Sequence, residues 1–353
     1  MGDVVLAPVE EVAGFIAVAL VACGLREDDA ASVGAIMAKT DTLGGDGHGV
    51  FRLPKYVARL RAGGVNPRPD IRVDRRVGAT AVLDGDNGMG QLVMQRAGAL
   101  AVEIARESGV GWVGAHHSNH AGAAAPYAMI PMEAGMIGIY VAVGSANHLP
   151  PWGGVEMLLS TNPIAVAIPA WEERAVLLDM ATTVAAYGKV KLAAQRGETM
   201  PEGWMVDKEG KPLTDPKRAN DGFLLPIGGP KGFGLALVFG LLAGTLNGAA
   251  MGRDVVDFNA DSSSVTNTGQ FVCALSLEAF GSAEGFRRQV DVVVRDMKES
   301  PLMPGFHEIR MPGERSQNLR EERLRTGIPL PGVLRAELRG VAETLGIGAP
   351  EWL

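Results

Sequence analysis

The N-terminal part of the chain repeats apolar positions with the period of an α-helix. In the first run these positions fall on one helical face: Val12, Phe15, Ile16, Ala19, Leu20 and Cys23. Such a face predicts a helix over residues 9–23, and similar patterns predict helices over residues 28–43, 50–60 and 333–345. Both ends of the chain are therefore expected to be helical.

The middle of the chain carries shorter apolar or alternating runs, which indicate strands. The predicted strands are residues 71–85, 110–115, 136–143, 164–168, 176–178 and 271–277. The helices predicted between and after them are residues 91–107, 121–135, 233–250 and 283–298. Residues 195–222 and 305–327 are polar and lack a period, so irregular structure is expected there. The uneven alternation of strands and helices favours a mixed α/β fold.

Composition narrows the classes of partner. The 353 residues are 47% hydrophobic and 21% charged, and the net charge of −7 is spread along the chain. This balance argues against nucleic acid or an anionic membrane as a partner. Residues 1–24 lack the basic start of a secretory signal, and no apolar run approaches the roughly 20 residues that a membrane span needs. We therefore expect a cytoplasmic protein in which Cys23 and Cys273 are buried free thiols.

A glycine-lysine loop, residues 228–234, runs directly into a predicted helix. Glycine frees backbone amides, Lys231 adds a positive charge, and the helix N-terminus behind them favours anions. The glycine spacing and the Ser or Thr of a Walker A loop are both missing. We expect this loop to hold phosphate or carboxylate, which points to an enzyme with a phosphate-bearing cofactor.

A second glycine motif, residues 109–114, matches the pattern G-x-G-x-x-G. A Rossmann fingerprint follows a strand and opens a helix, whereas here a predicted helix comes first and the glycines enter a strand. No acidic residue stands at a strand end about twenty positions later, as the motif requires. A dinucleotide bound by this chain is therefore expected to bind without the Rossmann fold.

Three side chains with complementary chemistry share one helical face after the polar turn 44–49. His48, Arg52 and Tyr56 follow one another at helical spacing. Arginine grips a carboxylate with two hydrogen bonds, and histidine moves a proton near neutral pH, which suits a small hydroxy or keto acid. The alternative is a helix that His48 caps and on which Arg52 and Tyr56 are exposed.

A cluster of three histidines ends the strand predicted over residues 110–115. Catalytic residues often follow a buried strand, but a polar turn that caps the next helix is one alternative. Another is a metal-dependent hydrolase built on His116, His117 and His120. The Ser-Asn helix start within the cluster and the lack of an H-E-x-x-H pattern count against metal, so none is expected.

Three further segments carry weaker signals. Residues 179–183 close a strand and precede a helix expected to reach residue 192. Their amides and hydroxyls suit phosphate or ribose, but plain capping by Thr182 or Thr183 explains them equally well. Thr161 lies in a turn before a strand, and His148 lies in a proline- and glycine-rich loop that could form a lid or a pocket wall.

These segments, taken together, resemble the malate/L-lactate dehydrogenase family of the non-Rossmann type. That family also holds ureidoglycolate and sulfolactate dehydrogenases, 2,3-diketogulonate reductase and reductases of cyclic imino acids. The resemblance covers about residues 9–345 and is specific because its fragments occur in order with family-like spacing. The fragments are residues 47–56, 118–122, 151–154, 161–163, 178–183, 201–204, 225–235 and 312–314.

The resemblance implies a fold and an assembly. A large mixed or antiparallel-rich sheet would bind NAD or NADP, and both chain ends would form a separate helical domain. The implied boundaries are residues 1–75 and 310–353 for the discontinuous helical domain and residues 76–309 for the sheet domain. The resemblance also implies a homodimer, which fits the apolar composition.

The resemblance also implies roles for single residues. Arg52 would anchor the substrate carboxylate, while His48 and His120 would be the active-site histidines, with His120 favoured as the proton donor. Further substrate contacts are expected from Tyr56, His148 and Thr161. The expected cofactor contacts are Ala121, Gly122, Asp179, Met180, Ala181, Thr182, Lys231, Gly232, Gly313 and Glu314.

The chain departs from the family pattern at informative positions. Gly47 replaces the usual Ser before the first histidine, which removes a relay to His48 and favours His120 as the donor. Ala121 replaces an aromatic residue and opens space beside the nicotinamide or substrate. His117 and His148 are also unusual and indicate a distinct substrate.

The expected reaction is reversible hydride transfer between NAD(P)H and C2 of a small 2-oxo acid. Reduction of a cyclic imino acid in the same pocket is the nearest alternative. A protein that binds the cofactor without catalysis is a third possibility, because of the missing Ser. The substrate's side chain, the choice between NAD and NADP, and the physiological direction stay open.

Overall fold

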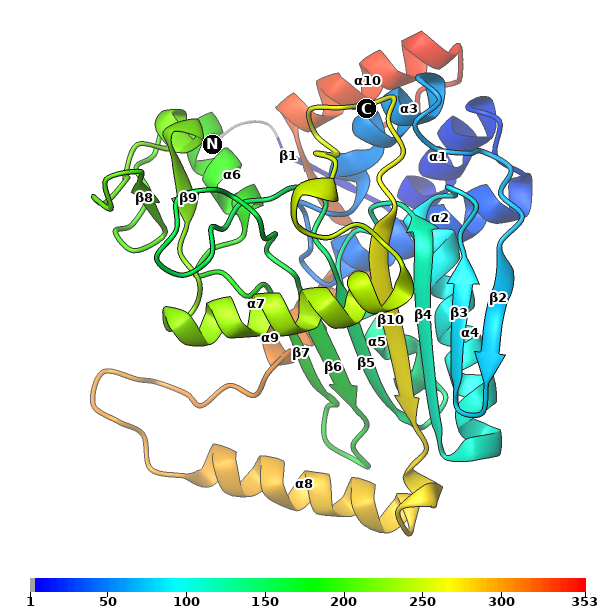
Figure 1. Cartoon of the computed structure of the whole chain (residues 1–353), viewed down its shortest axis with the longest axis vertical. Coiled ribbons are helices and arrows are strands. Elements are labelled where there is room, and N and C mark those ends of the chain that lie inside the picture. The colour runs from blue at the N-terminus through cyan, green and yellow to red at the C-terminus, as the bar shows by residue number, and fades with distance from the viewer. Residues whose placement is uncertain (1–3) are drawn as a thin grey trace.

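A mixed β-sheet of seven strands lies at the centre of the protein (Figure 1). The computed structural model describes residues 4–353, without the side chains of residues 192, 195 and 196. In sheet order the strands are β2 (Arg72–Val77), β3 (Thr80–Asp84), β4 (Val110–Ser118), β10 (Thr268–Leu275), β5 (Ile137–Ala142), β6 (Ile164–Ile168) and β7 (Val176–Met180). Within this sheet only β3 and β4 run parallel, and every other pair is antiparallel. The expected mixed α/β architecture is thereby confirmed.

Helices cover both faces of this sheet. α4 (Gly90–Ser108) and α5 (Ala125–Glu133) pack on one face, and α7 (Pro230–Ala243) lies across the other (Figure 1). Glycines bring the helices close, because a Cβ atom at Gly111 would lie 2.0 Å from the Ala101 carbonyl oxygen of α4. A Cβ atom at Gly138 would likewise lie 1.9 Å from a carbonyl oxygen of α5. The small residues are therefore required by packing.

The G-x-G-x-x-G segment has the same structural explanation. Gly109 ends α4 in the left-handed conformation, with a φ of 78°. The lack of a side chain at Gly111 lets α4 pack closely on β4. A Cβ atom at Gly114 would lie 1.9 Å from the side-chain oxygen of Asn247. Gly109 and Gly111 thus serve the junction between α4 and β4, and Gly114 makes room for Asn247, in line with rejecting a nucleotide-binding fingerprint at this position.

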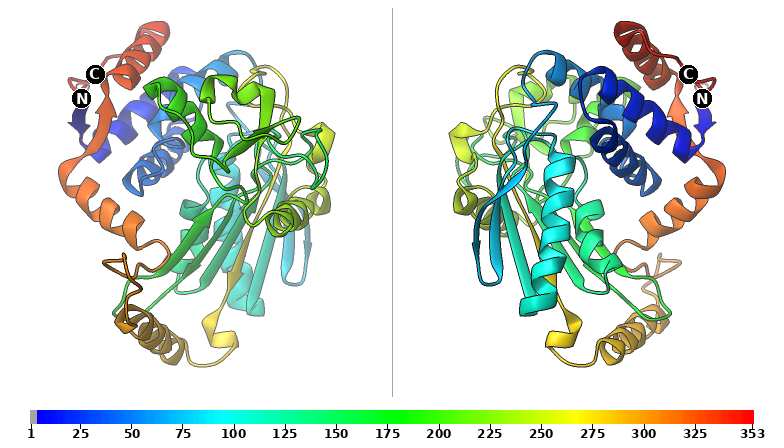
Figure 2. Two further views of the ribbon diagram at one scale, coloured as in Figure 1. Left: turned by 90° about the vertical axis from the view of Figure 1, so that its left-hand side faces the viewer. Right: turned by 90° about the vertical axis from the view of Figure 1, so that its right-hand side faces the viewer.

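The two chain ends pack together beside the sheet (Figure 2). Here α1 (Val9–Ala22), α2 (Glu27–Thr42), α3 (Leu53–Arg61) and α10 (Gly332–Leu345) share one hydrophobic core. β1 (Val4–Ala7) pairs with β11 (Ile328–Pro331) and joins the ends directly. Residues 1–3 of the expected helical domain lie outside the described residues. β2 starts before residue 76, so the sheet overlaps the expected boundary; the division into two domains stays a prediction.

Several predicted elements differ from the structure. Residues 195–222 contain β8 (Met205–Asp207) and β9 (Gly222–Leu224), and residues 305–327 contain α9 (Glu314–Thr326), so the expectation of irregular structure was wrong there. α9 has almost no apolar residues, which removed the periodic signal on which helix prediction depends. Neither Thr182 nor Thr183 caps a helix, because α6 (Tyr187–Arg196) begins later.

The remaining elements are α8 (Ala283–Glu299) and the short 3-10 helices Val50–Arg52, Pro216–Asp221, Thr245–Asn247, Gly252–Asp254 and Leu277–Ala279. α8 lies apart from the sheet at the bottom of Figure 1. Both cysteines are free: Cys273 is buried as expected, and Cys23 is only partly buried. None of the described helices combines the length and the apolar composition that crossing a membrane requires.

Candidate active site

A cavity of about 560 Å³ gathers most of the residues singled out in the sequence. The turn before α3, the segments that follow β4, β5 and β7, and the start of α6 form its walls. The expected site residues that line it are His48, Arg52, His120, Ala121, Gly122, His148, Thr161, Asp179, Met180 and Ala181. The fold therefore brings together segments that lie more than a hundred residues apart in the chain.

A second cavity, of about 330 Å³, adjoins the first. Gly45, Ala123 and Asp179 line both cavities, and Gly313 lines only the second. Asp179 is open to this space but otherwise surrounded by protein, and this burial raises its pKa. The hydrogen bond that its carboxyl group accepts from the Ala125 amide, at 2.9 Å, acts in the opposite direction. The two cavities form one elongated cleft with a carboxyl group where they meet.

Four of the expected cofactor contacts line neither cavity. Lys231 is exposed and Gly232 is buried at the start of α7, and no residue of the glycine-lysine loop lines the cavity, although Ile227 just before it does. Glu314 instead forms an ion pair with Lys298 at 2.8 Å. The Thr182 hydroxyl donates to the Thr161 carbonyl oxygen at 2.8 Å, so it positions the cavity wall from behind.

A buried carboxyl group shapes the turn that carries His48. Asp41, in α2, accepts a hydrogen bond from the Val50 amide at 2.8 Å. Burial raises the pKa of Asp41 to about 8, so the group is mostly uncharged at neutral pH. Only glycine fits opposite it, because a Cβ atom at Gly49 would lie 1.9 Å from a carboxyl oxygen of Asp41. Asp41 and Gly49 thus fix the backbone on either side of His48 without adding a full negative charge.

Arg52 is held in the cavity wall by neutral acceptors. Its Nε atom donates to the Gly47 carbonyl oxygen at 2.8 Å, and its NH1 atom donates to Asn259 Oδ1 at 3.1 Å. Among the described residues no carboxylate forms an ion pair with Arg52. Burial lowers the pKa of this guanidinium, but arginine stays charged in proteins. The cavity wall therefore carries a fixed positive charge, on Arg52, that has no ion-pair partner among the described residues.

His120 lies in an aromatic surrounding next to Arg52. Its Nδ1 atom is 2.7 Å from the Tyr56 hydroxyl oxygen, and its ring centroid is 4.8 Å from Phe258 and 5.7 Å from His48. Burial, reinforced by the charge of Arg52, lowers the pKa of His120 well below 6.5. The same two causes lower the pKa of His48 to about 4. Both imidazoles are therefore neutral in the folded protein at neutral pH.

Tyr56 does not line the cavity but supports His120 from behind. Burial raises the pKa of the Tyr56 phenol, so the hydroxyl keeps its proton and donates to Nδ1 of the neutral imidazole. This arrangement leaves Nε2 of His120 as the nitrogen that can exchange a proton with a ligand. The buried Nδ1 atom of His48 has no partner among the described protein atoms, so a ligand group can satisfy it.

The structure adds residues that the sequence did not indicate. Lys191 and Tyr187 of α6 line the cavity, and the Lys191 ammonium is 3.4 Å from the same Asn259 oxygen that Arg52 contacts. The expected substrate contact His148 stacks on Tyr187 with ring centroids 4.1 Å apart. Asn259 lies in a loop without a periodic pattern, so no sequence signal pointed to it. Lys191 belongs to a predicted helix, but the residues that it faces in the cavity come from distant segments, so its role was not visible in the sequence.

His116 and His117 are not part of this cavity. Neither residue lines it, whereas His120 faces Tyr56 and His48. The fold therefore does not bring the three histidines of the cluster together. The alternative of a hydrolytic metal centre built on all three is wrong. Ser118 and Asn119, which lie between His117 and His120 in the chain, are both buried.

The geometry defines an anion-binding site with proton-transfer groups, and known proteins give it a family. A model of the malate/L-lactate dehydrogenase family matches residues 7–339. Malate dehydrogenase from Pyrococcus abyssi is 37% identical over 348 residues, which cover 96% of this chain and 95% of that protein. Ureidoglycolate dehydrogenase (NAD(+)) from Escherichia coli K12 is 35% identical over 291 residues, 82% of each chain.

Solved structures agree with this result. The sulfolactate dehydrogenase from Methanocaldococcus jannaschii superposes with a TM-score of 0.90 at 36% identity, over 98% of each chain. The chain belongs to the malate/L-lactate dehydrogenase family. The expectation of a nicotinamide-dependent oxidoreductase that interconverts 2-hydroxy and 2-oxo acids is confirmed at the level of this class.

The packing of Asp41 against the turn before α3 can be tested with two neighbouring glycines. Gly49→Ala is expected to lower the free energy of unfolding by about 1–3 kcal/mol, because the new methyl group overlaps the Asp41 carboxyl group. Gly47→Ala is the control, since a Cβ atom there has nothing within 4 Å. Urea denaturation measures both variants, and equal losses would contradict this account of the turn.

Proposed function

We propose that this cleft holds a nicotinamide cofactor and a small 2-oxo acid whose carboxylate pairs with Arg52. The observation that carries the proposal is the buried guanidinium of Arg52, which faces two neutral imidazoles and has only neutral hydrogen-bond partners. A buried charge without a partner costs several kcal/mol, and a substrate carboxylate removes that cost. The planar guanidinium group of Arg52 suits two parallel hydrogen bonds to a carboxylate.

His120 and His48 divide the work at the reacting oxygen. When the oxo acid is reduced, the bound nicotinamide supplies a hydride to C2, and the carbonyl electron pair moves to the oxygen. His120, protonated for this step, gives its proton from Nε2 to that oxygen, while Tyr56 holds Nδ1. The lowered pKa of His120 makes its imidazolium a strong acid. His48 donates a hydrogen bond to the same oxygen and positions it.

The cleft suits a dinucleotide in shape and charge. Its two adjoining cavities, of about 560 and 330 Å³, give an elongated site. Lys189 of α6 lines the larger cavity and supplies positive charge for phosphate. Gly122 has a φ of 84°, which lets the backbone after His120 turn along the cavity wall. We assign the expected contacts that line the two cavities, including Gly313, to this cofactor and leave NAD and NADP as equal candidates.

The substrate is proposed to carry a second anionic group. Arg52 and Lys191 share the Asn259 side-chain oxygen at 3.1 and 3.4 Å, so two cations lie at one end of the cavity. One carboxylate can pair with Arg52, which leaves the Lys191 ammonium for another group. A four-carbon dicarboxylate or a sulfonated 2-oxo acid fits this charge pattern better than pyruvate does.

A panel assay tests the proposed reaction. NADH and NADPH oxidation is followed by absorbance with pyruvate, oxaloacetate, 2-oxoglutarate, sulfopyruvate and a cyclic imino acid. We expect turnover with the dianionic oxo acids at kcat/KM at least about tenfold above pyruvate, equivalent to about 1.4 kcal/mol. Turnover restricted to the imino acid would replace the oxo acid by that substrate. Tight cofactor binding without turnover on any compound would contradict catalysis of this type.

Arg52→Lys tests the carboxylate contact. The substitution keeps the charge but loses the planar fork, so kcat/KM for the preferred oxo acid is expected to fall by about 100-fold. Arg61→Lys, at the exposed last residue of α3, is the control and is expected to match the wild type. Steady-state kinetics with saturating cofactor measures both. Near-wild-type kcat/KM in Arg52→Lys would remove Arg52 from this role.

The pH dependence follows from the lowered pKa of His120. Oxidation of the hydroxy acid needs neutral His120 as the base, and that form dominates at every pH above 6.5 because the pKa is well below this value. We expect kcat/KM for oxidation to stay flat from about pH 8 down to 6.5. Reduction needs the protonated form, so its kcat/KM is expected to rise about tenfold per unit as the pH falls. A loss of oxidation centred near 6.5 would contradict the assignment.

We further propose a homodimer in the cytoplasm. α8 exposes Phe286, Val292, Val293 and Met297, and α7 exposes Leu235, Val238 and Leu241. Helices with so much exposed apolar surface are typical of an interface between subunits. Figures 1 and 2 show α8 apart from the sheet, where a second copy can reach it. The two free thiols fit a reducing compartment.

Charge substitutions test the dimer. Sedimentation velocity is expected to give twice the chain mass of 37.0 kDa for the wild type. Val238→Glu and Val293→Glu are expected to shift the protein to the monomer, because each places a charge in the apolar surface. Val77→Glu, at a 60% exposed position on the edge strand β2, is the control and should leave the dimer intact. A monomeric wild type, or dimers in both test variants, would contradict the proposal.

A further inference from the structure

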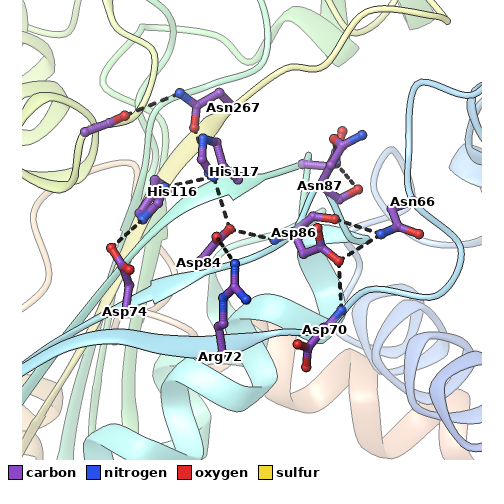
Figure 3. Close-up of polar contacts among 12 residues, drawn as sticks. Asn66, Asp70, Arg72, Asp74, Asp84, Asp86, Asn87, His116, His117 and Asn267 are labelled. Carbon is purple, nitrogen blue, oxygen red and sulfur yellow. Dashed lines mark hydrogen bonds and ion pairs between the residues drawn. The ribbon is translucent and has the colours of Figure 1, made fainter.

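A compact cluster of titratable side chains lies outside the cleft, where β3 and β4 end (Figure 3). Asp84 and His116 are direct partners in the parallel β3–β4 pair, and His117 follows on β4. The His117 Nδ1 atom is 3.1 Å from His116 Nδ1 and 3.1 Å from Asp84 Oδ1. One atom from each of the three side chains lies within 4.8 Å of the others. None of the three residues lines either cavity of the active site.

Hydrogen bonds alone do not satisfy this arrangement. If His117 Nδ1 carries a proton and donates it to Asp84, the lone pair of His116 Nδ1 faces an N–H group that is already engaged. If His116 donates instead, the lone pair of His117 faces the carboxylate oxygen at 3.1 Å. A cation accepts all three lone pairs at once, which one proton cannot do.

The spacing of the donor atoms matches a metal site. Zinc binds histidine nitrogen and carboxylate oxygen at about 2.0–2.2 Å, so neighbouring ligand atoms around it are about 3–3.5 Å apart. The distances from His117 Nδ1 to His116 Nδ1 and to Asp84 Oδ1, both 3.1 Å, lie in this range. Two imidazoles and one carboxylate also favour zinc and its neighbours in the first transition row over Mg²⁺ or Ca²⁺.

The groups around the cluster orient these ligands. His116 Nε2 is 3.4 Å from Asp74 Oδ2, so an imidazole that uses Nδ1 for metal can donate its other N–H to a carboxylate. Asp84 Oδ1 accepts from the Asp86 amide at 2.9 Å, which fixes that carboxylate. Arg72 approaches the other oxygen of Asp84 at 3.5 Å and leaves Oδ1 available. The His117 amide donates to Asn267 Oδ1 at 2.6 Å.

We propose that Asp84, His116 and His117 bind a divalent transition-metal cation of the zinc type. The His117 side chain is 50% exposed, which gives the ion an entry path and leaves room for water as a further ligand. The ion would link the ends of β3 and β4 just before the buried residues Ser118 and Asn119, which lead to His120. This site is independent of the proposed reaction and differs from the absence of metal expected from sequence.

Zinc titration of the purified protein tests the site. Isothermal titration calorimetry with Zn²⁺ alone, and metal analysis after dialysis, are applied to the wild type and to His117→Asn and Asp84→Asn. Asparagine is chosen at position 117 because this residue has a φ of 48°, a conformation that asparagine tolerates. His307→Ala is the control, since it removes an exposed histidine elsewhere. Circular dichroism confirms that each variant is folded.

We expect one Zn²⁺ per chain in the wild type and in His307→Ala, with binding at least about tenfold weaker in both test variants. Zn²⁺ should also raise the Tm of the wild type but not of the folded test variants. Lack of zinc binding by the wild type would overturn the proposal. Unchanged binding in His117→Asn and Asp84→Asn would do the same, because it would place the ion elsewhere, for example at His48 and His120. If a variant does not fold, the visible spectrum of Co²⁺ bound to the wild type decides whether nitrogen ligands hold the ion.

Discussion

A largely buried guanidinium without a carboxylate partner is the constraint on which this site depends. Among the residues that the structure describes, Arg52 donates hydrogen bonds to a backbone carbonyl and to the amide oxygen of Asn259 and forms no ion pair. Its charge, added to burial, lowers the pKa of both His48 and His120. Asp41, a buried acid beside the turn that carries His48, has a pKa raised to about 8 and supplies little negative charge at neutral pH. The site therefore keeps an uncompensated positive field that an anionic substrate can occupy.

The fold sustains this arrangement by supplying each wall of the cleft from a different layer. The turn and the 3-10 helix before α3 carry His48 and Arg52, while the segment after β4 carries His120. Phe258, from the loop before β10, contacts both the His120 ring and the guanidinium of Arg59 and belongs to the core of the chain ends. The imidazole is thus packed between the helical layer and the sheet, which keeps it neutral.

Sequence reasoning found the parts of the site that depend on local pattern. The spacing of His48, Arg52 and Tyr56 and the polar end of β4 pointed to residues around the cavity, although only Tyr56 lies in α3. Most long helices and central strands were predicted within a few residues, but α7 ends at Ala243 and not at residue 250. The family resemblance supplied the roles of single residues, which the structure brings into one cleft but does not test.

Other features could not be predicted because they depend on contacts between distant segments. Asn259 and Lys191 reach Arg52 through the tertiary fold, and β1 pairs with β11 across almost the whole chain. The polar helix α9 has no periodic apolar face that would reveal it. The exposure of Lys231 was likewise hidden, because glycine and lysine in a loop indicate an anion site whether or not the loop faces the cleft.

The most direct test of the account compares the two active-site histidines. Single-turnover kinetics and NADH binding are measured for His120→Gln and His48→Gln with the preferred oxo acid. We expect His120→Gln to lose at least about 1,000-fold in the rate of hydride transfer while it binds NADH normally, and His48→Gln to lose less, because only His120 moves the proton. Hydride transfer within tenfold of the wild type in His120→Gln, together with its loss in His48→Gln, would contradict the account.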